Sequence, residues 1–495
     1  MKSNLVLTLD QGTTSSRALL IRGDGAAEAS AQYEFTQYFP KQGWVEHDPN
    51  EIWSTIKHAI NDVLTGIDVS RVKAIGITNQ RETTVMWNRK TGEAIGRAIV
   101  WQDRRTASMC EQLKLQGLGE HVYKTTGLLI DAYFSATKMQ WLMQHHPEAQ
   151  ILAKRDELCL GTIDSWLIAK LTGSELHVTD VSNASRTMLY DIHRMQWDQV
   201  MLDACQIPES ALPAVKPSMG FFGEAQINGL NIPISGVAGD QQAALFGQRC
   251  FSRGMVKNTY GTGCFMLMNT GQEAPVSSHG LLSTIAWSDG EKVTYALEGS
   301  VFIAGAAVQW LRDAMQLIDN AAESEYFALK AEEKEYVYVV PAFAGLGAPY
   351  WDMYARGAVF GLTRDTGKEE IIRATLESLA YQTRDVLDAM VQDAGTSIHS
   401  LLVDGGASAN DFLMQFQSDI IQRMVVRPKN IEATALGVSW MAGIGAGLWT
   451  MKDIGALHIN HQNFKPKMEQ GLADKRYAGW QKAVKRTMHW VDDEP

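Results

Sequence analysis

Cysteine is scarce in this sequence, and no two cysteines form a metal-binding or redox motif. The 495 residues include five cysteines, widely spaced and without a Cys-x-x-Cys pair: Cys110, Cys159, Cys205, Cys250 and Cys264. An odd, scattered set of this kind is typical of reduced thiols in the cytoplasm and argues against a disulfide framework. We therefore expect a cytoplasmic protein.

Positive charge and long apolar runs are also lacking. The net charge is −11, which argues against a nucleic-acid surface because phosphates are neutralised by a basic stripe. In residues 1–10 the apolar run is too short for a signal peptide before Asp10 interrupts it. Elsewhere no uncharged stretch approaches the roughly 18 to 20 residues that span a bilayer. We expect a soluble chain with no nucleic-acid partner and no membrane insertion.

Several common nucleotide and metal motifs are absent. Gly-Lys occurs only at Gly367-Lys368 and is followed by Glu369, so the sequence has no Walker A motif. No Gly-x-Gly-x-x-Gly follows a strand-like run, and no His-Glu-x-x-His is present. These absences argue against a Rossmann dehydrogenase and a zinc hydrolase.

A repeated pattern of strand, glycine turn and strand organises the chain. The first copy covers residues 5–21 and the second covers residues 254–268, with alternating apolar residues on both sides of each turn. The length exceeds what one hydrophobic core supports, so two domains are expected. We place the N-terminal domain at residues 1–248 and the C-terminal domain at residues 249–495.

Helical and strand-like stretches alternate in the rest of the sequence. Residues 368–394 carry apolar side chains at helical spacing, and Gly395 supplies a stop. Strand-like runs at residues 72–77 and 400–403 are followed by polar or glycine turns and then by helical patterns. This alternation predicts an α/β fold.

Residues 10–16, Asp-Gln-Gly-Thr-Thr-Ser-Ser, form the most informative short run. Gly12 allows a tight turn whose backbone N–H groups and hydroxyls can grip phosphate oxygens. Asp10 is a hard oxygen ligand suited to Mg²⁺. The alternative is an ordinary polar hairpin turn, which is a common feature.

Three further segments strengthen the phosphate hypothesis. Residues 236–244 place Asp240 after an expected glycine turn and before a helical run, and residues 260–263 form a second nest-like turn. Residues 402–410 lead from a strand into a Gly-Gly turn, against which a planar purine could lie without side-chain obstruction. Four such turns in this order are much rarer than any one of them.

These segments resemble the phosphate and adenosine motifs of the actin, hexokinase and heat-shock ATPase superfamily. Along essentially its whole length the chain resembles the FGGY carbohydrate kinases, most closely their glycerol-phosphorylating members. The matching stretches are residues 78–84, 101–105, 134–138, 239–244, 257–263 and 345–351. The resemblance implies two ribonuclease H-like (actin/hexokinase-type) domains with a nucleotide cleft between them.

The same resemblance implies a polyol pocket. Its expected members are Arg81, Glu82, Tyr133 and Gln241 as partners of hydroxyl groups, Trp101 and Phe265 against the carbon skeleton, and Asp240 as the catalytic base. Arginine offers a fork of donors and glutamate offers acceptors, so the Arg81-Glu82 pair can orient hydroxyls. Without the resemblance, this pair would be a surface ion pair, and the two rings would be core aromatics.

The resemblance also implies ATP and Mg²⁺, with Asp10 assigned to the metal. The residues expected to bind nucleotide are Thr13, Thr14, Ser15 and Arg17 from the first domain, and Thr262, Gly305, Gln309, Gly406 and Asn410 from the second. The implied reaction is ATP-dependent phosphorylation of glycerol to sn-glycerol 3-phosphate in glycerol catabolism. We also expect a homo-oligomer, either a dimer or a tetramer.

The sequence departs from its relatives at their regulatory segments. Residues 224–231 contain neither the Gly-Gly-Thr-Arg loop that binds fructose 1,6-bisphosphate in some relatives nor the phosphorylatable histidine of others. Residues 466–474 differ from the segment that docks a regulatory protein in enteric relatives. We expect none of these modes of regulation here. Two alternatives stay open: a kinase for a larger polyol or ketose, and a nucleotide-binding regulator or chaperone-like ATPase on the same scaffold.

Overall fold

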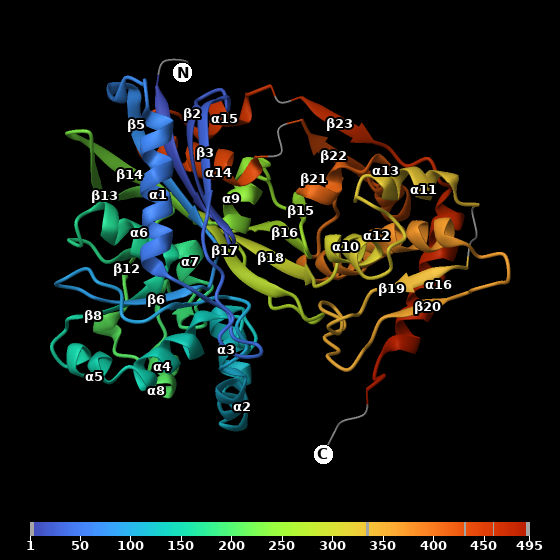
Figure 1. Cartoon of the computed structure of the whole chain (residues 1–495), viewed down its shortest axis with the longest axis horizontal. Helices are drawn as coiled ribbons and strands as arrows, with labels where there is room; N and C mark the ends of the chain where they lie inside the picture. Colours follow the sequence, from blue (N-terminus) through green and yellow to red (C-terminus); the bar gives the residue numbers. More distant parts are fainter. Residues whose placement is uncertain (1–3, 333–335, 430–431, 459, 492–495) are drawn as a thin grey trace.

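The computed structural model describes residues 4–332, 336–429, 432–458 and 460–491, and Figure 1 shows them arranged around two large sheets. We expect no signal peptide in residues 1–10, and residues 1–3 of that segment lie outside the described residues. The first sheet has the order β13 (Met219–Ile227), β14 (Leu230–Gly239), β5 (Val72–Asn79), β1 (Leu5–Gln11), β2 (Ser15–Arg22), β3 (Ala27–Glu34).

The hairpin of β1 and β2 confirms the expected strand, turn and strand at the start of the chain. The two strands pair antiparallel, with Asp10 opposite Arg17. Every residue of β1 except Asp10 is buried. On its other side β1 pairs in parallel with β5, which in turn pairs in parallel with β14. The chain therefore returns through crossover helices between these parallel strands.

The second sheet repeats this plan. Its order is β17 (Leu282–Ser288), β18 (Val293–Val301), β16 (Cys264–Gly271), β15 (Val256–Tyr260), β21 (Ser400–Asp404), β22 (Met424–Pro428), β23 (His461–Phe464). The strands β15 and β16 form the second expected hairpin, and β15 pairs in parallel with β21. Two halves built on the same plan confirm the predicted α/β fold class.

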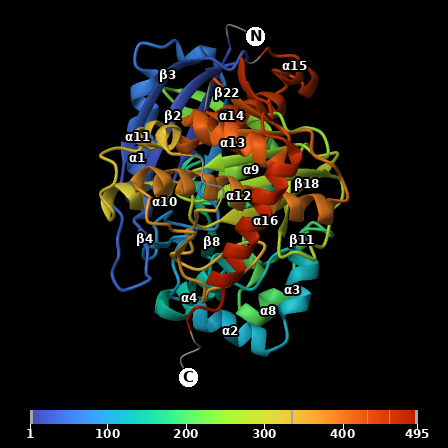
Figure 2. The same cartoon turned by 90° about the vertical axis from the view of Figure 1, so that its right-hand side faces the viewer.

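Helices cover the outer faces of both sheets. Apolar residues of α1 (Pro49–Leu64) and α6 (Ile163–Leu171) share a core with β1, β2 and β5. Figure 2 shows α12 (Lys368–Ala394), α13 (Asp411–Ile421) and α16 (Gln470–Thr487) on the outer side of the second sheet. The expected helix at residues 368–394 is confirmed, and Gly395 ends it with φ 58°, a left-handed conformation that glycine adopts readily.

Two helices lie between the sheets and join the halves. These are α9 (Asp240–Gly247) and α14 (Ala433–Gly445), which Figure 1 shows side by side near the centre. The two helices meet at glycines. A Cβ on Gly247 would lie 1.9 Å from the carbonyl oxygen of Ala433, and a Cβ on Gly437 would lie 1.8 Å from the carbonyl oxygen of Ala243. Their apolar residues form one core with both sheets.

The expectation of a glycine turn at residues 236–239 is wrong, because these residues are the end of β14. A Cβ on Gly236 would lie 2.3 Å from the Ala442 backbone nitrogen on α14, and one on Gly239 would lie 2.8 Å from the Arg81 side chain. The glycines therefore permit close packing rather than chain reversal.

An additional layer is inserted into the first half. Its sheet has the order β4 (Glu46–His47), β7 (Ala98–Ile99), β6 (Thr84–Asn88), β8 (Leu158–Thr162). Its helices are α2 (Ala107–Leu115), α3 (Gly119–Thr126), α4 (Ser135–His145), α5 (Pro147–Ala153), α7 (Val181–Ala184) and α8 (Gln199–Cys205). This layer carries several of the expected site residues.

The remaining elements are short. The second half adds α10 (Gly305–Asp313), α11 (Glu323–Lys330) and α15 (Met451–Gly455). Two-residue or three-residue strands pair as β9 (Val178–Asp180) with β12 (Ala214–Lys216), β10 (Tyr190–Asp191) with β11 (Gln196–Trp197), and β19 (Tyr338–Val340) with β20 (Ala358–Phe360). Turns of 3₁₀-helix lie at Val69–Arg71, Glu209–Ala211 and Gly406–Ala409.

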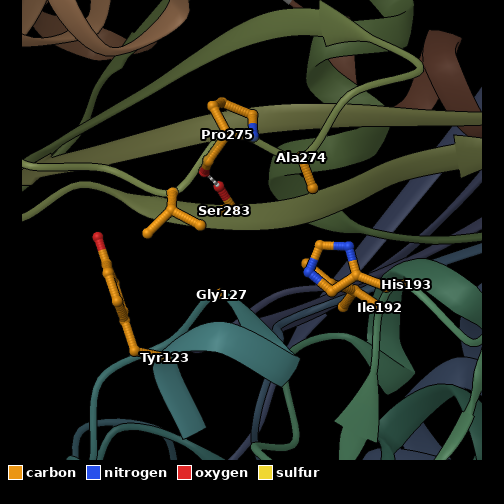
Figure 3. Close-up of a pocket in the computed structure, with 8 residues that line it drawn as sticks. Tyr123, Gly127, Ile192, His193, Ala274, Pro275 and Ser283 are labelled. Atoms are coloured by element: carbon orange, nitrogen blue, oxygen red, sulfur yellow. Dashed lines mark hydrogen bonds between the residues drawn. The ribbon is translucent and has the colours of Figure 1, made fainter. Parts of the chain in front are cut away.

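The two halves also meet at a second place, below α9 and α14 in the view of Figure 1. The Ser283 backbone nitrogen donates to the Gly127 carbonyl oxygen at 2.9 Å. Figure 3 shows a small cavity at this contact, with Tyr123 and His193 from the first half and Pro275 from the second. Its volume of about 10 Å³ has room for about one water molecule, so this junction is closed.

All five cysteines are buried as free thiols. In the described part of the chain, no helix combines the length and the apolar character needed to cross a membrane.

Candidate active site

Arg81 and Glu82 follow β5 on a short loop that is tied to the first hairpin. The Gln80 side chain donates to Gln11 Oε1 and to the Gly12 carbonyl oxygen, both at 3.1 Å. Glu82 has a positive φ of 58°, which a non-glycine residue adopts only where its surroundings enforce it. The loop is therefore held in one conformation beside the turn of residues 10–16, called the phosphate turn below.

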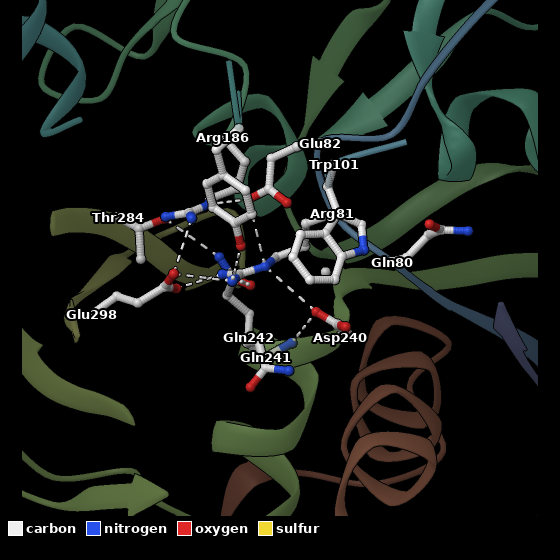
Figure 4. A network of polar contacts seen from close by, with 12 residues as sticks. Gln80, Arg81, Glu82, Trp101, Arg186, Asp240, Gln241, Gln242, Thr284 and Glu298 are labelled. Atoms are coloured by element: carbon white, nitrogen blue, oxygen red, sulfur yellow. Dashed lines mark hydrogen bonds and ion pairs between the residues drawn. The ribbon is translucent and has the colours of Figure 1, made fainter. Parts of the chain in front are cut away.

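Arg81 and Glu82 belong to a buried network of four charges, not to a surface ion pair. Figure 4 shows the guanidinium groups of Arg81 and Arg186 converging on Glu298, a residue of β18 in the second half. Arg81 Nη2 donates to Glu298 Oε1 at 3.0 Å, and Arg186 Nη2 donates to the same oxygen at 2.9 Å. Arg186 Nε donates to Glu82 Oε1 at 2.7 Å. All four side chains are at most 2% exposed.

The charges in this network balance, because two cations meet two anions. Burial opposes ionisation of Glu298, but the cations of Arg186 and Arg81 outweigh it and lower its pKa to about 2. Burial raises the pKa of Glu82, and the same two arginines offset part of that rise. Buried charges of this kind persist only when they are paired. Glu298 is thus a fixed anion that holds Arg81 in place.

Three aromatic rings stand next to the network. The centroid of the Trp101 ring lies 5.7 Å from that of Tyr133 and 6.4 Å from that of Phe265, both edge-on. Trp101 Nε1 donates to Thr13 Oγ1 at 3.1 Å. All three rings are half-buried, which differs from the full burial of a core aromatic. Trp101 and Tyr133 come from the first half and Phe265 from the second.

The α4 helix positions Tyr133. Lys138 Nζ donates to the carbonyl oxygens of Tyr133 at 2.6 Å and Phe134 at 3.0 Å. Ser135 Oγ donates to the Glu82 carbonyl oxygen at 3.0 Å. Burial lowers the pKa of Lys138 to about 8. The Tyr133 hydroxyl accepts from Arg81 Nη2 at 3.4 Å, so the phenol and the guanidinium face the same space.

Asp240 is the first residue of α9 and lies against Arg81. Its Oδ1 is 3.4 Å from Arg81 Nε, and its side chain is 33% exposed. Burial raises the pKa of Asp240, while the charges of Arg81 and Lys257 partly offset the rise. Lys257 Nζ donates to Gln241 Oε1. A carboxylate with a raised pKa, accessible at one side and placed at a helix N-terminus, can accept a proton.

The phosphate turn carries an ion pair of its own. Arg17 Nη2 donates to Asp10 Oδ2 at 2.9 Å, and Arg17 also pairs with Glu432, the residue before α14. The Gly12 backbone nitrogen donates to the Ser15 carbonyl oxygen at 2.9 Å. The Thr13 hydroxyl accepts a hydrogen bond from Trp101, and Thr14 is exposed. Burial raises the pKa of Asp10, and Arg17 partly offsets this effect.

Several expected nucleotide residues of the second half come together. The backbone nitrogens of Ala304 and Ala306 donate to the Thr262 carbonyl oxygen, at 2.9 and 3.0 Å. The Gly305 nitrogen donates to the Gly261 carbonyl oxygen at 3.0 Å. A Cβ on Gly405, next to Gly406, would lie 2.5 Å from the Tyr260 carbonyl oxygen. The turns at residues 260–263, 304–306 and 405–406 therefore pack against one another.

The other two expected nucleotide residues lie on neighbouring helices. Gln309 is exposed on α10, one turn beyond Gly305. Asn410 caps α13, since its Oδ1 accepts from the Leu413 backbone nitrogen at 2.9 Å, and its Nδ2 donates to Ser324 Oγ at 3.3 Å. The side-chain amide of Asn410 thus has partners on α13 and α11.

Sequence reasoning missed four charged residues of the site: Arg186, Lys257, Glu298 and Glu432. Glu298 left a signal, because it is a single carboxylate within the otherwise uncharged run Tyr295-Ala-Leu-Glu-Gly-Ser-Val301. A charge inside a buried strand needs a partner. Arg186 left the same kind of signal as the single charged residue of the run 181–190, but its partners lie 104 and 112 residues away and could not be named from the sequence.

Family models match both halves of the chain. Residues 5–247 match the N-terminal domain of the FGGY family of carbohydrate kinases, and residues 256–446 match its C-terminal domain. The chain belongs to the FGGY family of carbohydrate kinases. The resemblance inferred from the sequence is thereby confirmed, and the two-domain kinase fold with it.

Relatives of this FGGY chain are similar along nearly the full length. The glycerol kinase of Natranaerobius thermophilus is 57% identical, with 99% of each chain covered. The glycerol kinase of Klebsiella pneumoniae is 54% identical, with 99% of this chain and 98% of the relative covered. Among solved structures, Plasmodium falciparum glycerol kinase with ADP superposes with a TM-score of 0.93 at 37% identity, covering 98% of both chains. A Lactobacillus acidophilus xylulose kinase shares the fold, with a TM-score of 0.85 at 21% identity over 98% and 97% of the two chains.

Proposed function

We propose that this chain transfers the γ-phosphoryl group of ATP to glycerol, giving ADP and sn-glycerol 3-phosphate for glycerol catabolism. One observation carries the proposal. The Asp240 carboxylate, partly exposed at the start of α9, lies 3.4 Å from Arg81 Nε beside a half-buried wall of three aromatic rings. The likeness to relatives named as glycerol kinases, at 54–57% identity over nearly the full chain, supports it.

The substrate half of the site suits a short polyol. Arg81 and Glu82 would hold hydroxyl groups as donor and acceptor, and Tyr133 and Gln241 would complete the set. The rings of Trp101 and Phe265 would pack against the carbon skeleton. Since Glu298 and Arg186 fix Arg81 and Glu82 from behind, these partners are oriented before substrate arrives.

Asp240 would act as the general base. It accepts the proton of the attacking hydroxyl while the new bond forms from that oxygen to the γ-phosphorus. The bond from the γ-phosphorus to the oxygen that bridges to ADP breaks at the same time, and the electron pair leaves with ADP. Phosphoryl transfer of this kind depends on in-line positioning and charge neutralisation.

The nucleotide would lie between the two halves. Thr13, Thr14, Ser15 and the backbone of the first turn would contact the phosphates, with Arg17 exchanging one of its carboxylate partners for a phosphate oxygen. The remainder of the nucleotide would be bound by the second half. The residues expected there are Thr262, Gly305 and Gly406 on the packed turns, with Gln309 and Asn410 on the neighbouring helices. Closure of the halves would exclude water that could otherwise be phosphorylated.

The residues present fit Mg²⁺, with Asp10 as its holder and Asp240 nearby. Burial raises the pKa of Asp240, and the negative charge of Asp10 adds to that rise. In the described ranges no group of three or more His, Cys, Asp or Glu could hold a metal alone, and Mg²⁺ sites typically combine one or two carboxylates with substrate phosphates. When bound, the ion supplies neutralisation of the developing phosphate charge.

The test is ADP release by purified protein with MgATP, measured with and without glycerol, with ³¹P NMR of the product. We expect glycerol-dependent ADP release and a phosphomonoester at the terminal carbon. The same rate of ADP release with and without glycerol would contradict the proposal and would favour a nucleotide-binding regulator on the same scaffold.

The remaining expectations stay predictions. These are the boundary between residues 248 and 249, a cytoplasmic location, a dimer or tetramer, and the lack of the regulatory modes described above. Light scattering coupled to gel filtration would give the oligomeric state.

A further inference from the structure

A second cavity lies between the two halves of the molecule, away from the active site. Its volume is about 190 Å³. It is bounded in the first half by the turn between β2 and β3 and the end of α9, and in the second half by the end of β22, the start of α14 and the start of β23, all near the top of Figure 1. Its walls therefore come from both halves of the molecule.

Two buried polar atoms in the cavity wall have no partner among the described residues. They are the indole Nε1 of Trp440 and the ring Nδ1 of His461. Trp440 is only 1% exposed. A buried indole N–H normally donates a hydrogen bond, and this donor therefore lacks an acceptor that a ligand in the adjoining cavity would supply.

The cavity wall also carries two cations. Arg249 and Lys429 line it against the single carboxylate of Asp24, and His458 and His461 add two imidazole rings. Arg249 is anchored, because its Nη1 donates to the Leu457 carbonyl oxygen at 2.7 Å. Burial lowers the pKa of His461, and the charges of Arg249 and His458 lower it further. The field in the cavity therefore favours an anion.

We propose that this cavity binds a small phosphate-bearing anion, either inorganic phosphate or a phosphate ester of a few carbon atoms. A phosphate offers several acceptor oxygens, which suits an indole N–H, an imidazole and cationic side chains carried by different elements of the cavity wall. The volume lies below the roughly 300–1,000 Å³ of pockets for drug-sized ligands. A whole nucleotide is therefore too large.

An anion here would touch segments that are bonded directly to the active site. Gln248, which lines the cavity, donates through Nε2 to Asp404 Oδ2 at 3.0 Å, and Asp404 precedes the Gly405-Gly406 turn. Ala433, another lining residue, follows Glu432, whose carboxylate pairs with Arg17 of the phosphate turn. The site is thus placed to bridge the two halves.

The test is calorimetric titration of the full chain at constant ionic strength, with inorganic phosphate in one arm and 2-phosphoglycolate in the other. Trp440→Phe removes the N–H and keeps a ring, and Lys429→Gln removes an exposed charge. We expect saturable binding of at least one probe, weakened about tenfold or more in the double variant, as for loss of charge-assisted hydrogen bonds. The probe that binds with the higher affinity shows whether the ligand is inorganic phosphate or a phosphate ester.

The matched control is Lys452→Gln, because Lys452 is exposed on α15 outside the cavity. It should bind both probes as the unaltered chain does. Lys429→Gln alone keeps the test decisive if the Trp440 variant folds poorly. Equal affinity in the control and the cavity variants would place the anion elsewhere, and absence of saturable binding would refute the site. Because the titration requires no turnover, its result is independent of the proposed kinase reaction.

Discussion

The two sides of the proposed active site are built differently. On the substrate side, charged side chains are buried and paired with one another, as in the network of Arg81, Arg186 and Glu298. On the nucleotide side, the contributions come mainly from backbone turns, and Thr14, Thr262 and Gly406 are exposed. The proposed polyol pocket is therefore held in place by its own ion pairs, whereas the proposed nucleotide surface consists of exposed turns.

The largest expected effect concerns the base. Asp240→Asn keeps the size of the side chain and removes its ability to take a proton, so kcat should fall by about 10²–10⁴-fold. Glycerol binding measured by calorimetry should stay nearly unchanged. Steady-state kinetics give the first quantity, and turnover close to that of the unaltered chain would remove Asp240 from the chemistry.

The next effect tests the buried network. Glu298→Gln should lower the free energy of unfolding by about 3–5 kcal/mol, because two buried guanidinium groups lose their shared anion. The control is Glu273→Gln, which breaks the exposed pair with Arg253 and should change stability very little. Urea unfolding measures both. Equal effects of the two variants would show that the network contributes no more than a surface pair.

A pair of neighbouring glycines tests the nucleotide side. A Cβ on Gly406 would meet nothing within 4 Å, so Gly406→Ala should fold normally but raise the KM for ATP roughly tenfold, since a methyl group would crowd the nucleotide. Gly405 has φ 85° and a Cβ there would meet the Tyr260 backbone, so Gly405→Ala should instead lose stability. An unchanged KM in Gly406→Ala would move the nucleotide away from this turn.

The smallest expected effect is a shift in pH dependence. Burial raises the pKa of Asp240, and the charges of Arg81 and Lys257 hold it down. Lys257→Met should raise that pKa further, and since the base works deprotonated, the acid limb of kcat/KM should move to higher pH. Lys292→Met, at an exposed position, should leave the profile in place. A shift to lower pH would contradict the assigned base.

Local features of the fold were predictable from the sequence. The hairpins at the start of each half and the helix Lys368–Ala394 follow from alternating or helical apolar spacing between glycine signals. The expected turn at residues 236–239 failed for a physical reason. Glycine serves both chain reversal and close packing, and only the position of α14 against β14 distinguishes the two.

The site was predictable only in part. Arg81, Glu82, Trp101, Tyr133 and Asp240 were selected through resemblance, and the structure brings them together. Glu298 reaches Arg81 across 217 residues of sequence, and such long-range pairing leaves no periodic signal. The partners that orient the pocket therefore emerge only when both halves are seen together.

The most direct test of the account compares substrates. The kcat/KM for MgATP-dependent phosphorylation should be measured for glycerol beside erythritol, xylulose, ribulose and gluconate. We predict strong activity with glycerol and little with the longer compounds, because the rings of Trp101, Tyr133 and Phe265 would limit the length of the pocket. Preference for a longer sugar would keep the fold and the phosphate turn but contradict the glycerol pocket.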